Sequence, residues 1–317
     1  MAQAPPNKEF DNFVQPLRRP GRWVAAAVLI FFFVAFAQAI ATNENIDFPT
    51  IGEYLFNSRI LSGVQITVTV TIIAMLSAAI LAVLLAAMRL SGNPVFVVFS
   101  ALYVWAFRGT PLLVQIVIWG YLGLIFEKIS FGIPFTNIVF FAVDTNTLIP
   151  AFVAGILALT LNEAAYSAEI VRSGMLSVDE GQREAAASLG MSPQYCFVKI
   201  LLPQAMRVII PPMGNQLISM IKNTSLLSLI AVLELYTQAS QISAQNLRQV
   251  ELLIVVSIWY LTLVTILSIP QYYLERYFGR GSTKNQPLGP LQRVREVTGS
   301  IQIQRQRQRQ SKKLGRK

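Results

Sequence analysis

The chain has 317 residues, of which 54% are hydrophobic and only 13% are charged. An average soluble domain has about 25% charged residues, so this composition excludes an ordinary water-soluble protein and indicates a membrane protein. The net charge of +10 resides in residues 279–317, whose eleven basic residues and one acid account for all of it. A nucleic-acid-binding function would rest on that tail alone, and we expect no nucleic acid partner.

Two residue types limit the chemistry of the chain. The sequence contains no histidine and one cysteine, Cys196, which excludes an intramolecular disulfide and removes the commonest metal ligand and general base. We therefore expect no catalytic residue, no metal site and no cofactor, and a membrane-embedded enzyme is disfavoured. The phosphate-binding pattern G-x-x-x-x-G-K-[ST] does not occur, so any ATP must be bound by a partner chain.

Six apolar stretches predict an all-α integral membrane protein with about six transmembrane helices. Residues 1–23 form a polar N-terminal segment, and the first apolar stretch is residues 24–41. A secretory signal peptide is the alternative there, but about 18 apolar residues with a bulky aromatic block favour a retained helix. The remaining stretches are residues 64–88, 95–126, 148–170, 208–233 and 252–274.

The stretch 95–126 is longer than one crossing requires. As one helix it would measure about 48 Å, which exceeds a hydrocarbon core of about 30 Å. The run Arg108-Gly109-Thr110-Pro111 interrupts it. We therefore predict an interfacial or bent first part, followed by a span that ends near Phe126.

Basic residues predict the orientation. With the N-terminus inside, three basic residues fall in the outer loops and more than ten fall in the inner segments. The positive-inside rule then places both termini and the segment 171–207 in the cytoplasm, with the protein in the inner or plasma membrane. The tail 279–317 is rich in Gln, Arg and Lys, and we expect it to be disordered. It adheres to anionic membrane lipid, or it is only a solvated topology determinant.

Residues 177–203 predict two short helices joined by a tight turn on the cytoplasmic side. Ser177 and Glu180 have the spacing of a capping box, which would start the first helix. Gly190 favours the left-handed conformation that ends a helix. The pair Ser192-Pro193 is typical of the cap and first residue of the second helix.

The first of these helices has a face suited to contact with another protein. The side chains of Ala185, Ala186 and Leu189 are apolar and mostly small. The alternative is that this segment packs only against its own chain and contacts no other protein. We expect the second helix to end before Pro203.

This segment resembles the EAA loop of ABC importer permeases. The motif positions are occupied by Glu184, Ala185, Ala186, Gly190, Leu202 and Pro203. In that family the loop forms the coupling helix, which docks into a groove on the ATPase. The resemblance implies that the first four residues form the surface that docks on a separate ATPase and that Pro203 closes the element.

The resemblance extends over roughly residues 60–275, to the polar-amino-acid branch of these permeases. Its other matching segments are residues 108–115, 165–172, 181–182, 202–205 and 222–226. It implies a five-helix type I ABC importer core at 60–275 with one added N-terminal helix. It also implies three kinds of partner: ATPase subunits that bind the ATP, a second permease chain, identical or related, and an extracytoplasmic amino-acid-binding protein.

The function implied by this resemblance is that of the permease subunit of an ATP-driven amino acid importer that works by alternating access. Its substrate would be a polar amino acid such as glutamate or glutamine, arginine or histidine, or cystine. An ion- or proton-coupled secondary transporter is the alternative, with Glu163 and Lys222 as its coupling site. Many relatives have a small residue at the position of Glu163 and an Asp at that of Asn223, which leaves the exact amino acid open.

Polar residues inside the predicted spans are candidates for the substrate path. They are Arg108, Asn162, Glu163, Asn215, Ser219, Lys222, Asn223 and Thr224. A charge deep in a span costs at least about 2.5 kcal/mol, so these groups should face protein or water. Four of them, Asn215, Ser219, Lys222 and Asn223, share one face of the span 208–233. This face lines the substrate path, or it forms a buried network between helices.

Two of these candidates have a second interpretation. Arg108 binds a substrate carboxylate through both guanidinium nitrogens, or its side chain reaches lipid phosphate. A salt bridge between Glu163 and Lys222 would neutralise both charges, but the two residues differ in predicted depth, so this pairing stays open.

Overall fold

A computed structural model describes residues 20–133 and 138–278 of the chain. The predictions made for residues 1–19 and for the tail 279–317, including its contact with lipid, lie outside the described residues. Within the described part, five helices are long and apolar enough to cross a membrane, and the bent pair α4–α5 adds a sixth crossing if it counts as one span. The prediction of an all-α membrane fold is confirmed.

The elements follow one another in a simple order. The first half contains α1 (Pro20–Ala41), α2 (Phe48–Leu55), α3 (Ser58–Leu90), α4 (Pro94–Gly109), α5 (Leu112–Gly120), α6 (Leu122–Ile125), β1 (Lys128–Gly132), β2 (Val139–Asp144) and α7 (Thr145–Leu148). The second half contains α8 (Ala151–Leu176), α9 (Glu180–Ser188), α10 (Pro193–Cys196), a π-helical turn (Phe197–Leu201), α11 (Leu202–Asn223), a 3-10 helix (Thr224–Ile230), α12 (Leu235–Asn246) and α13 (Gln249–Phe278). The small antiparallel sheet of β1 and β2 lies where no strand is predicted from the sequence.

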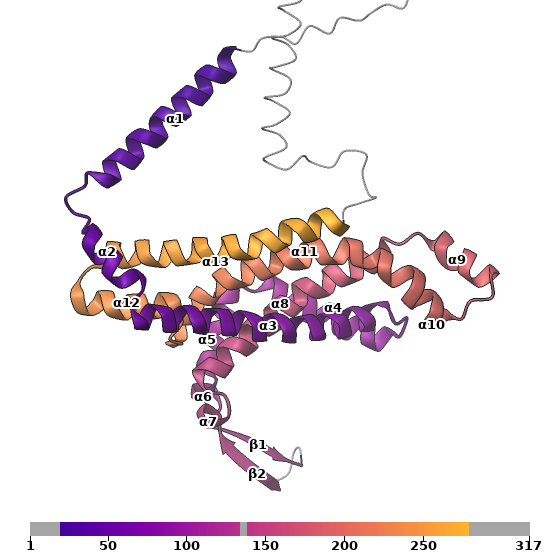
Figure 1. Ribbon diagram of the computed structural model, residues 1–317. Coiled ribbons are helices and arrows are strands. Elements are labelled where there is room, and N and C mark those ends of the chain that lie inside the picture. The colour runs from indigo at the N-terminus through magenta and orange to yellow at the C-terminus, as the bar shows by residue number, and fades with distance from the viewer. Residues whose placement is uncertain (1–19, 134–137, 279–317) are drawn as a thin grey trace, which may run out of the picture.

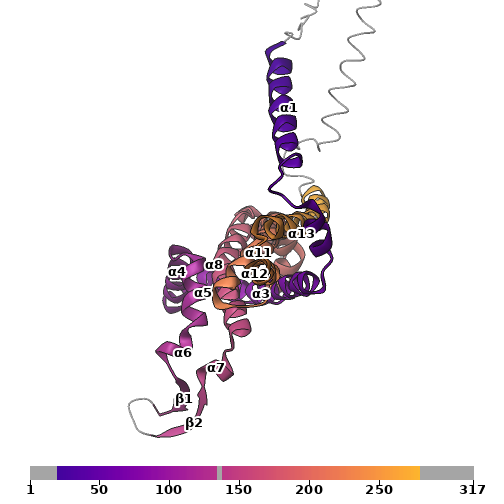
Figure 2. The same cartoon turned by 90° about the vertical axis from the view of Figure 1, so that its left-hand side faces the viewer.

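The helices α3, α8, α11 and α13 form a bundle in which they run along nearly one direction (Figure 1), and the second view looks down that bundle (Figure 2). The most extensive contact joins α3 and α8. Both helices present alanines there, and Ala74, Ala78, Ala154 and Ala158 are at most 1% exposed. Small residues let two helix backbones approach closely, which is how helices gain packing energy in lipid.

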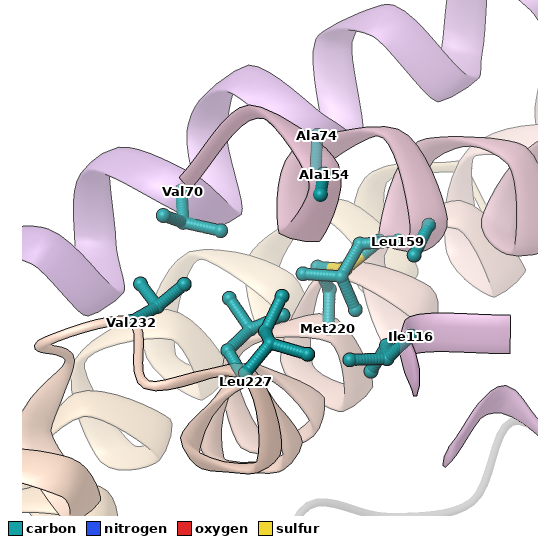
Figure 3. Close-up of a cluster of buried hydrophobic side chains, with 10 residues drawn as sticks. Val70, Ala74, Ile116, Ala154, Leu159, Met220, Leu227 and Val232 are labelled. Atoms are coloured by element: carbon teal, nitrogen blue, oxygen red, sulfur yellow. The ribbon is translucent and has the colours of Figure 1, made fainter. Parts of the chain in front are cut away.

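An apolar cluster lies where α3, α5, α8 and the end of α11 meet. Val70, Ile116, Leu159, Met220 and Leu227 are at most 1% exposed. Figure 3 shows these side chains, which come from segments far apart in the sequence, pointing into one region. This cluster fixes the start of α5 against α8, directly after the bend.

The first helix, α1, stands apart from the bundle (Figure 1). No residue of its apolar window Trp23–Ala41 is buried. Its phenylalanines are therefore free to face lipid, as the predicted extra span requires. Whether α1 forms a unit separate from residues 60–275 stays a prediction.

The short helix α2 joins α1 to the bundle through polar contacts. The amide of Asp47 donates to the Glu251 carboxylate at 3.1 Å, and Arg248 lies 3.4 Å from the Asp47 carboxylate. The hydroxyl of Thr50 donates to that carboxylate at 2.8 Å and, together with the Thr50 amide and Arg248, lowers the pKa of Asp47. The indole of Trp259 also donates to the Leu55 carbonyl at 2.8 Å. This end of the chain is thus held to α13.

The predicted helix 208–233 differs from the structure at both ends. α11 begins earlier, at Leu202, and ends at Asn223, after which a 3-10 helix leads to Ala231 in the left-handed conformation at φ 58°. The hydroxyl of Thr224 donates to the Ile221 carbonyl at 2.7 Å. Such a bond from a threonine side chain to the preceding turn competes with the α-helical ladder, so the helix tightens here.

The glycine at position 63 permits the contact between α3 and α12. A Cβ atom on Gly63 would lie 2.8 Å from the Leu235 Cα and 3.0 Å from the Leu235 nitrogen. These are backbone atoms, so the two helices would have to separate. Overpacking of this kind costs about 1–3 kcal/mol, and we expect Gly63→Ala to lower the midpoint of thermal unfolding in detergent by several degrees.

A matched control for this prediction is Gly52→Ala in α2. Nothing lies within 4 Å of a Cβ atom added at Gly52. Alanine favours a helix over glycine by about 1 kcal/mol, so this variant should unfold at the same temperature as the parent or slightly above it. Equal midpoints for the two variants would contradict the assigned role of Gly63.

Candidate functional site

The pair α9–α10 forms a helical hairpin that projects beyond one end of the bundle (Figure 1). The Asp179 carboxylate caps α9 by accepting from the Gly181 amide at 2.8 Å. Gly190 ends this helix at φ 70°, a conformation that side chains disfavour. Ser192 caps α10, whose first residue is Pro193. The predicted helix, glycine turn and second helix are confirmed.

The predicted cap at Ser177 is wrong. Its hydroxyl donates to the Gly174 carbonyl at 2.7 Å and its amide donates to the Ser173 carbonyl at 3.0 Å, so Ser177 ends α8. Its backbone is helical, at φ −76° and ψ −13°, whereas a residue that starts a helix has an extended backbone. Asp179 takes the capping role instead.

The predicted helix end before Pro203 is also wrong. The chain passes from α10 through the π-helical turn directly into α11, and Pro203 lies in the first turn of α11. Proline is accepted there because its missing amide would have no partner in a first helical turn. The Leu202 amide bonds to the Phe197 carbonyl across the wider turn. The element therefore continues into a long helix instead of closing.

The side chains of the α9–α10 hairpin divide into an inner and an outer set. Ala186 is 1% exposed and packs with Cys196 and Leu201, so the expectation that its methyl group lies on the docking face is corrected. Glu184 and Ala185 are exposed, and Leu189 is 80% exposed. The outward surface thus includes an acid, a small residue and a largely exposed leucine beside the glycine turn.

A polar network joins the α4–α5 bend to α8. The amide of Asn162 donates to the Phe107 carbonyl at 3.0 Å and to the Gln115 side chain at 3.2 Å. Gln115 donates in turn to the Thr110 hydroxyl at 2.7 Å. The network satisfies backbone groups freed by the 99° bend, as a non-aqueous environment requires. Gln115 was not among the predicted site residues, although a single amide inside an apolar run is the signal that would have indicated it.

Glu163 lies one residue further along α8 and connects α8 to α11. It is 5% exposed. Its carboxylate accepts from the Ser167 hydroxyl at 2.7 Å and from the Gln216 amide at 3.4 Å. Gln216, a second residue missed from the sequence, carries this network to the neighbouring pocket.

A pocket of about 380 Å³ lies between α4, α8 and α11. It is lined by Arg108, Tyr166, Glu169, Ile170, Ser173, Val208, Pro212 and Gln216. The guanidinium of Arg108 lies 5.1 Å from the centroid of the Tyr166 ring, a cation–π arrangement that fixes its position. Glu169 is already paired with Arg172 at 2.8 Å. Arg108 is therefore the basic group of this pocket that forms no ion pair within the described residues.

A second hollow of about 520 Å³ lies on the face shared by α11 and α13. It is lined by Lys222, Ser225, Ser257, Tyr260, Leu261 and Val264. Lys222 is exposed and does not pair with Glu163, so the salt bridge left open from the sequence is not formed. Lys222 lines a hollow with residues of α13, whereas the Glu163 carboxylate accepts from Ser167 and Gln216.

The other predicted path residues of α11 have separate environments. Asn215 is exposed and donates to the Glu275 carboxylate at 3.4 Å. Ser219 and Asn223 are half-buried, and Thr224 is fully buried. The structure thus brings Arg108 and Glu163 to one side of α11 and leaves Lys222 on another.

Comparison with known proteins places this geometry in a family. The family model described as the binding-protein-dependent transport system inner membrane component matches residues 78–280. The arginine transport system permease protein ArgU of Corynebacterium glutamicum is 43% identical over 90% of this chain and 89% of its own length. The L-cystine transport system permease protein TcyB of Bacillus subtilis is 39% identical over 69% of this chain and 86% of its own.

A solved structure agrees with these relatives. The crystal structure of an amino acid ABC transporter with histidines matches with a TM-score of 0.62 and 31% identity, over 73% of this chain and 99% of that one. The chain therefore belongs to the family of binding-protein-dependent transport system inner membrane components, and it is an ABC transporter permease subunit.

Proposed function

The chain is the permease subunit of an ABC amino acid importer, and we propose that its substrate is arginine. The likeness to the arginine permease ArgU supports the substrate, because it runs over 289 residues, whereas the likeness to the cystine permease TcyB runs over 220. The chemistry of the pocket agrees with this choice. Arg108, which lines the pocket, suits the α-carboxylate of an amino acid.

The observation that carries the coupling mechanism is the projecting α9–α10 hairpin. Its outer surface of Glu184, Ala185, Leu189 and Gly190 has few contacts with the rest of the described chain and suits docking into a groove on a separate ATPase. The buried Ala186 supports that surface from below. Since α10 continues into α11 without a break, movement of the docked hairpin would be transmitted directly to the helix that borders the pocket.

The assembly and its orientation follow from this arrangement. The end of the bundle that carries the α9–α10 hairpin lies in the cytoplasm, together with most of the basic residues of the chain. Both termini lie there as well. Two ATPase subunits bind and hydrolyse ATP, so this chain is not itself an enzyme. A second permease chain completes the pore, and an extracytoplasmic binding protein delivers the amino acid to the opposite end. ATP-driven closure of the motors then alternates access to the pocket.

The test is uptake of radiolabelled arginine into proteoliposomes that contain the permease, its ATPase and its binding protein. We expect uptake only when ATP is enclosed with the ATPase, and none when the ATPase is omitted. Uptake driven by a proton or sodium gradient without the ATPase would instead establish the secondary transporter. Uptake of another amino acid in preference to arginine would overturn the substrate and leave the coupling mechanism intact.

A further inference from the structure

The α8 wall of the pocket between α4, α8 and α11 carries a negative group close to the free Arg108. One face of α8 lines the pocket with residues spaced by three or four, which are Tyr166, Glu169, Ile170 and Ser173. The guanidinium of Arg108 lies over the Tyr166 ring. Glu169 follows Tyr166 by three residues, which is about 4.5 Å along α8. The pocket thus presents a positive group and, one turn of α8 nearer to the α9–α10 hairpin, a negative one.

Glu169 is the acid that a cation in this pocket would meet. Among the residues of the described chain that line the pocket, it is the only acid. Its side chain is 25% exposed, so it is reachable from the pocket. Glu163 does not line the pocket, and its buried carboxylate already accepts from Ser167 and Gln216.

The group that Glu169 binds in this structure is itself a guanidinium. Arg172 Nε donates to the two carboxylate oxygens at 3.1 and 3.2 Å, and Nη2 donates to one of them at 2.8 Å. Within residues 20–133 and 138–278, neither side chain forms a hydrogen bond or ion pair with a third group. A partly exposed pair of this spacing contributes little to stability, so Glu169 and Arg172 separate at small cost.

Free arginine carries the same group at one end and a carboxylate at the other. When Arg108 binds that carboxylate, the flexible methylene chain lets the substrate's guanidinium reach across the about 5 Å of one helical turn. The pocket volume of about 380 Å³ lies in the range of roughly 300–1,000 Å³ that small-molecule sites have. We propose that Glu169 selects the cationic side chain of the substrate and that Arg172 occupies its place until the substrate's guanidinium replaces it. The inference rests on the proposed function, because it assigns the other end of the same arginine.

Such an exchange would make the pocket selective in two ways. A guanidinium matches a carboxylate with a planar pair of hydrogen bonds, which a neutral side chain cannot replace. A neutral amino acid would therefore leave the Glu169–Arg172 pair closed. In the empty pocket, Arg172 also keeps the partly buried Glu169 carboxylate from standing unpaired, which would be costly.

The experiment compares the binding of arginine and citrulline to the purified permease–ATPase complex. Citrulline has the same backbone and chain length, but an uncharged ureido group replaces the guanidinium. We expect the parent to bind arginine at least about 10-fold more tightly. Glu169→Gln should lower the affinity for arginine to that for citrulline and leave the affinity for citrulline unchanged. A parental preference for arginine in Glu169→Gln would overturn the proposal.

A matched control is Glu53→Gln, which neutralises an exposed acid of α2. This helix lies at the opposite end of the bundle from α9 (Figure 1). The control should keep the parental preference for arginine over citrulline. Loss of the preference in this variant as well would show a general effect of charge and would count against Glu169.

Arg172→Gln gives a result of the opposite sign. Removal of the internal guanidinium frees Glu169, so the affinity for arginine should rise about 3-fold or more, because the competent form is then more populated. The affinity for citrulline should not change. The gain should vanish in the double variant with Glu169→Gln, as coupling between the two residues requires. A purely structural ion pair would give a lower unfolding temperature and no gain, which would overturn the exchange, as would a gain that persisted in the double variant.

These outcomes also separate the inference from the proposed substrate. If the parent complex bound another amino acid in preference to arginine, the proposed substrate would fail, and the role of Glu169 with it. If the parent preferred arginine and the Glu169→Gln complex did so equally, only the role of Glu169 would fail.

Discussion

Glu184→Lys is expected to abolish ATP-driven uptake and leave the permease folded. Glu184 is exposed on α9, and its side chain forms no hydrogen bond or ion pair within residues 20–133 and 138–278. Its substitution therefore costs the permease little stability. Reversal of a charge at the centre of the docking surface should cost about 2 kcal/mol or more, as at an interface hot spot, which weakens association about 30-fold.

The measurement is co-purification of the ATPase with tagged permease, followed by uptake in proteoliposomes. The matched control is Glu127→Lys, which reverses an exposed acid directly before β1, away from α9. We expect the control to retain its ATPase and both variants to unfold at the parent temperature. If Glu184→Lys retained a full complement of ATPase, the α9–α10 hairpin could not be the coupling element.

The local signals of this hairpin explain why it could be predicted from sequence. Gly190 and the pair Ser192-Pro193 act through their own backbone preferences, so neighbours elsewhere in the chain do not alter the outcome. The cap at Ser177 was wrong because α8 continues for two turns past the predicted end of its apolar stretch. The helix end predicted before Pro203 was wrong because Pro203 lies in the first turn of α11, where a missing amide is tolerated, and no sequence signal marks the π-helical turn before it.

The candidate pocket was predicted less well, because it depends on contacts between distant segments. Arg108 and Tyr166 meet because α4 packs against α8. The rise per residue along a helix predicts how deep a residue lies in the membrane, but not the direction of its side chain. For that reason the sequence left a Glu163–Lys222 salt bridge open, whereas the structure gives the two side chains different surroundings. The strands β1 and β2 were missed for a different reason. Ile129 and Phe131 are apolar at alternate positions, as in a strand, but the segment is short and lies between long apolar helices, which dominated its interpretation.

Arg108→Ala is expected to remove most of the affinity of the permease for arginine. The guanidinium is held over Tyr166 and forms no ion pair in the described part of the chain. It is therefore available to a substrate carboxylate. Hydrogen bonds to charged groups contribute about 1.5–3 kcal/mol each, so we expect a loss of about 10-fold to 100-fold in binding to the purified permease–ATPase complex. Arg108→Lys should recover part of it, because lysine keeps the charge but not the planar fork.

The sharper comparison uses agmatine, which is arginine without its carboxylate. If Arg108 binds that carboxylate, the parent complex should bind arginine more tightly than agmatine by the same factor by which Arg108→Ala lowers the affinity for arginine. The Arg108→Ala complex should bind arginine and agmatine with equal affinity. Tyr166→Phe keeps the ring under the guanidinium and should behave as the parent, whereas Tyr166→Leu should fall between the parent and Arg108→Ala. The alternative role of Arg108, contact with lipid phosphate, gives a different pattern. Lysine would then replace arginine fully, and no variant at this position would change the preference for arginine over agmatine.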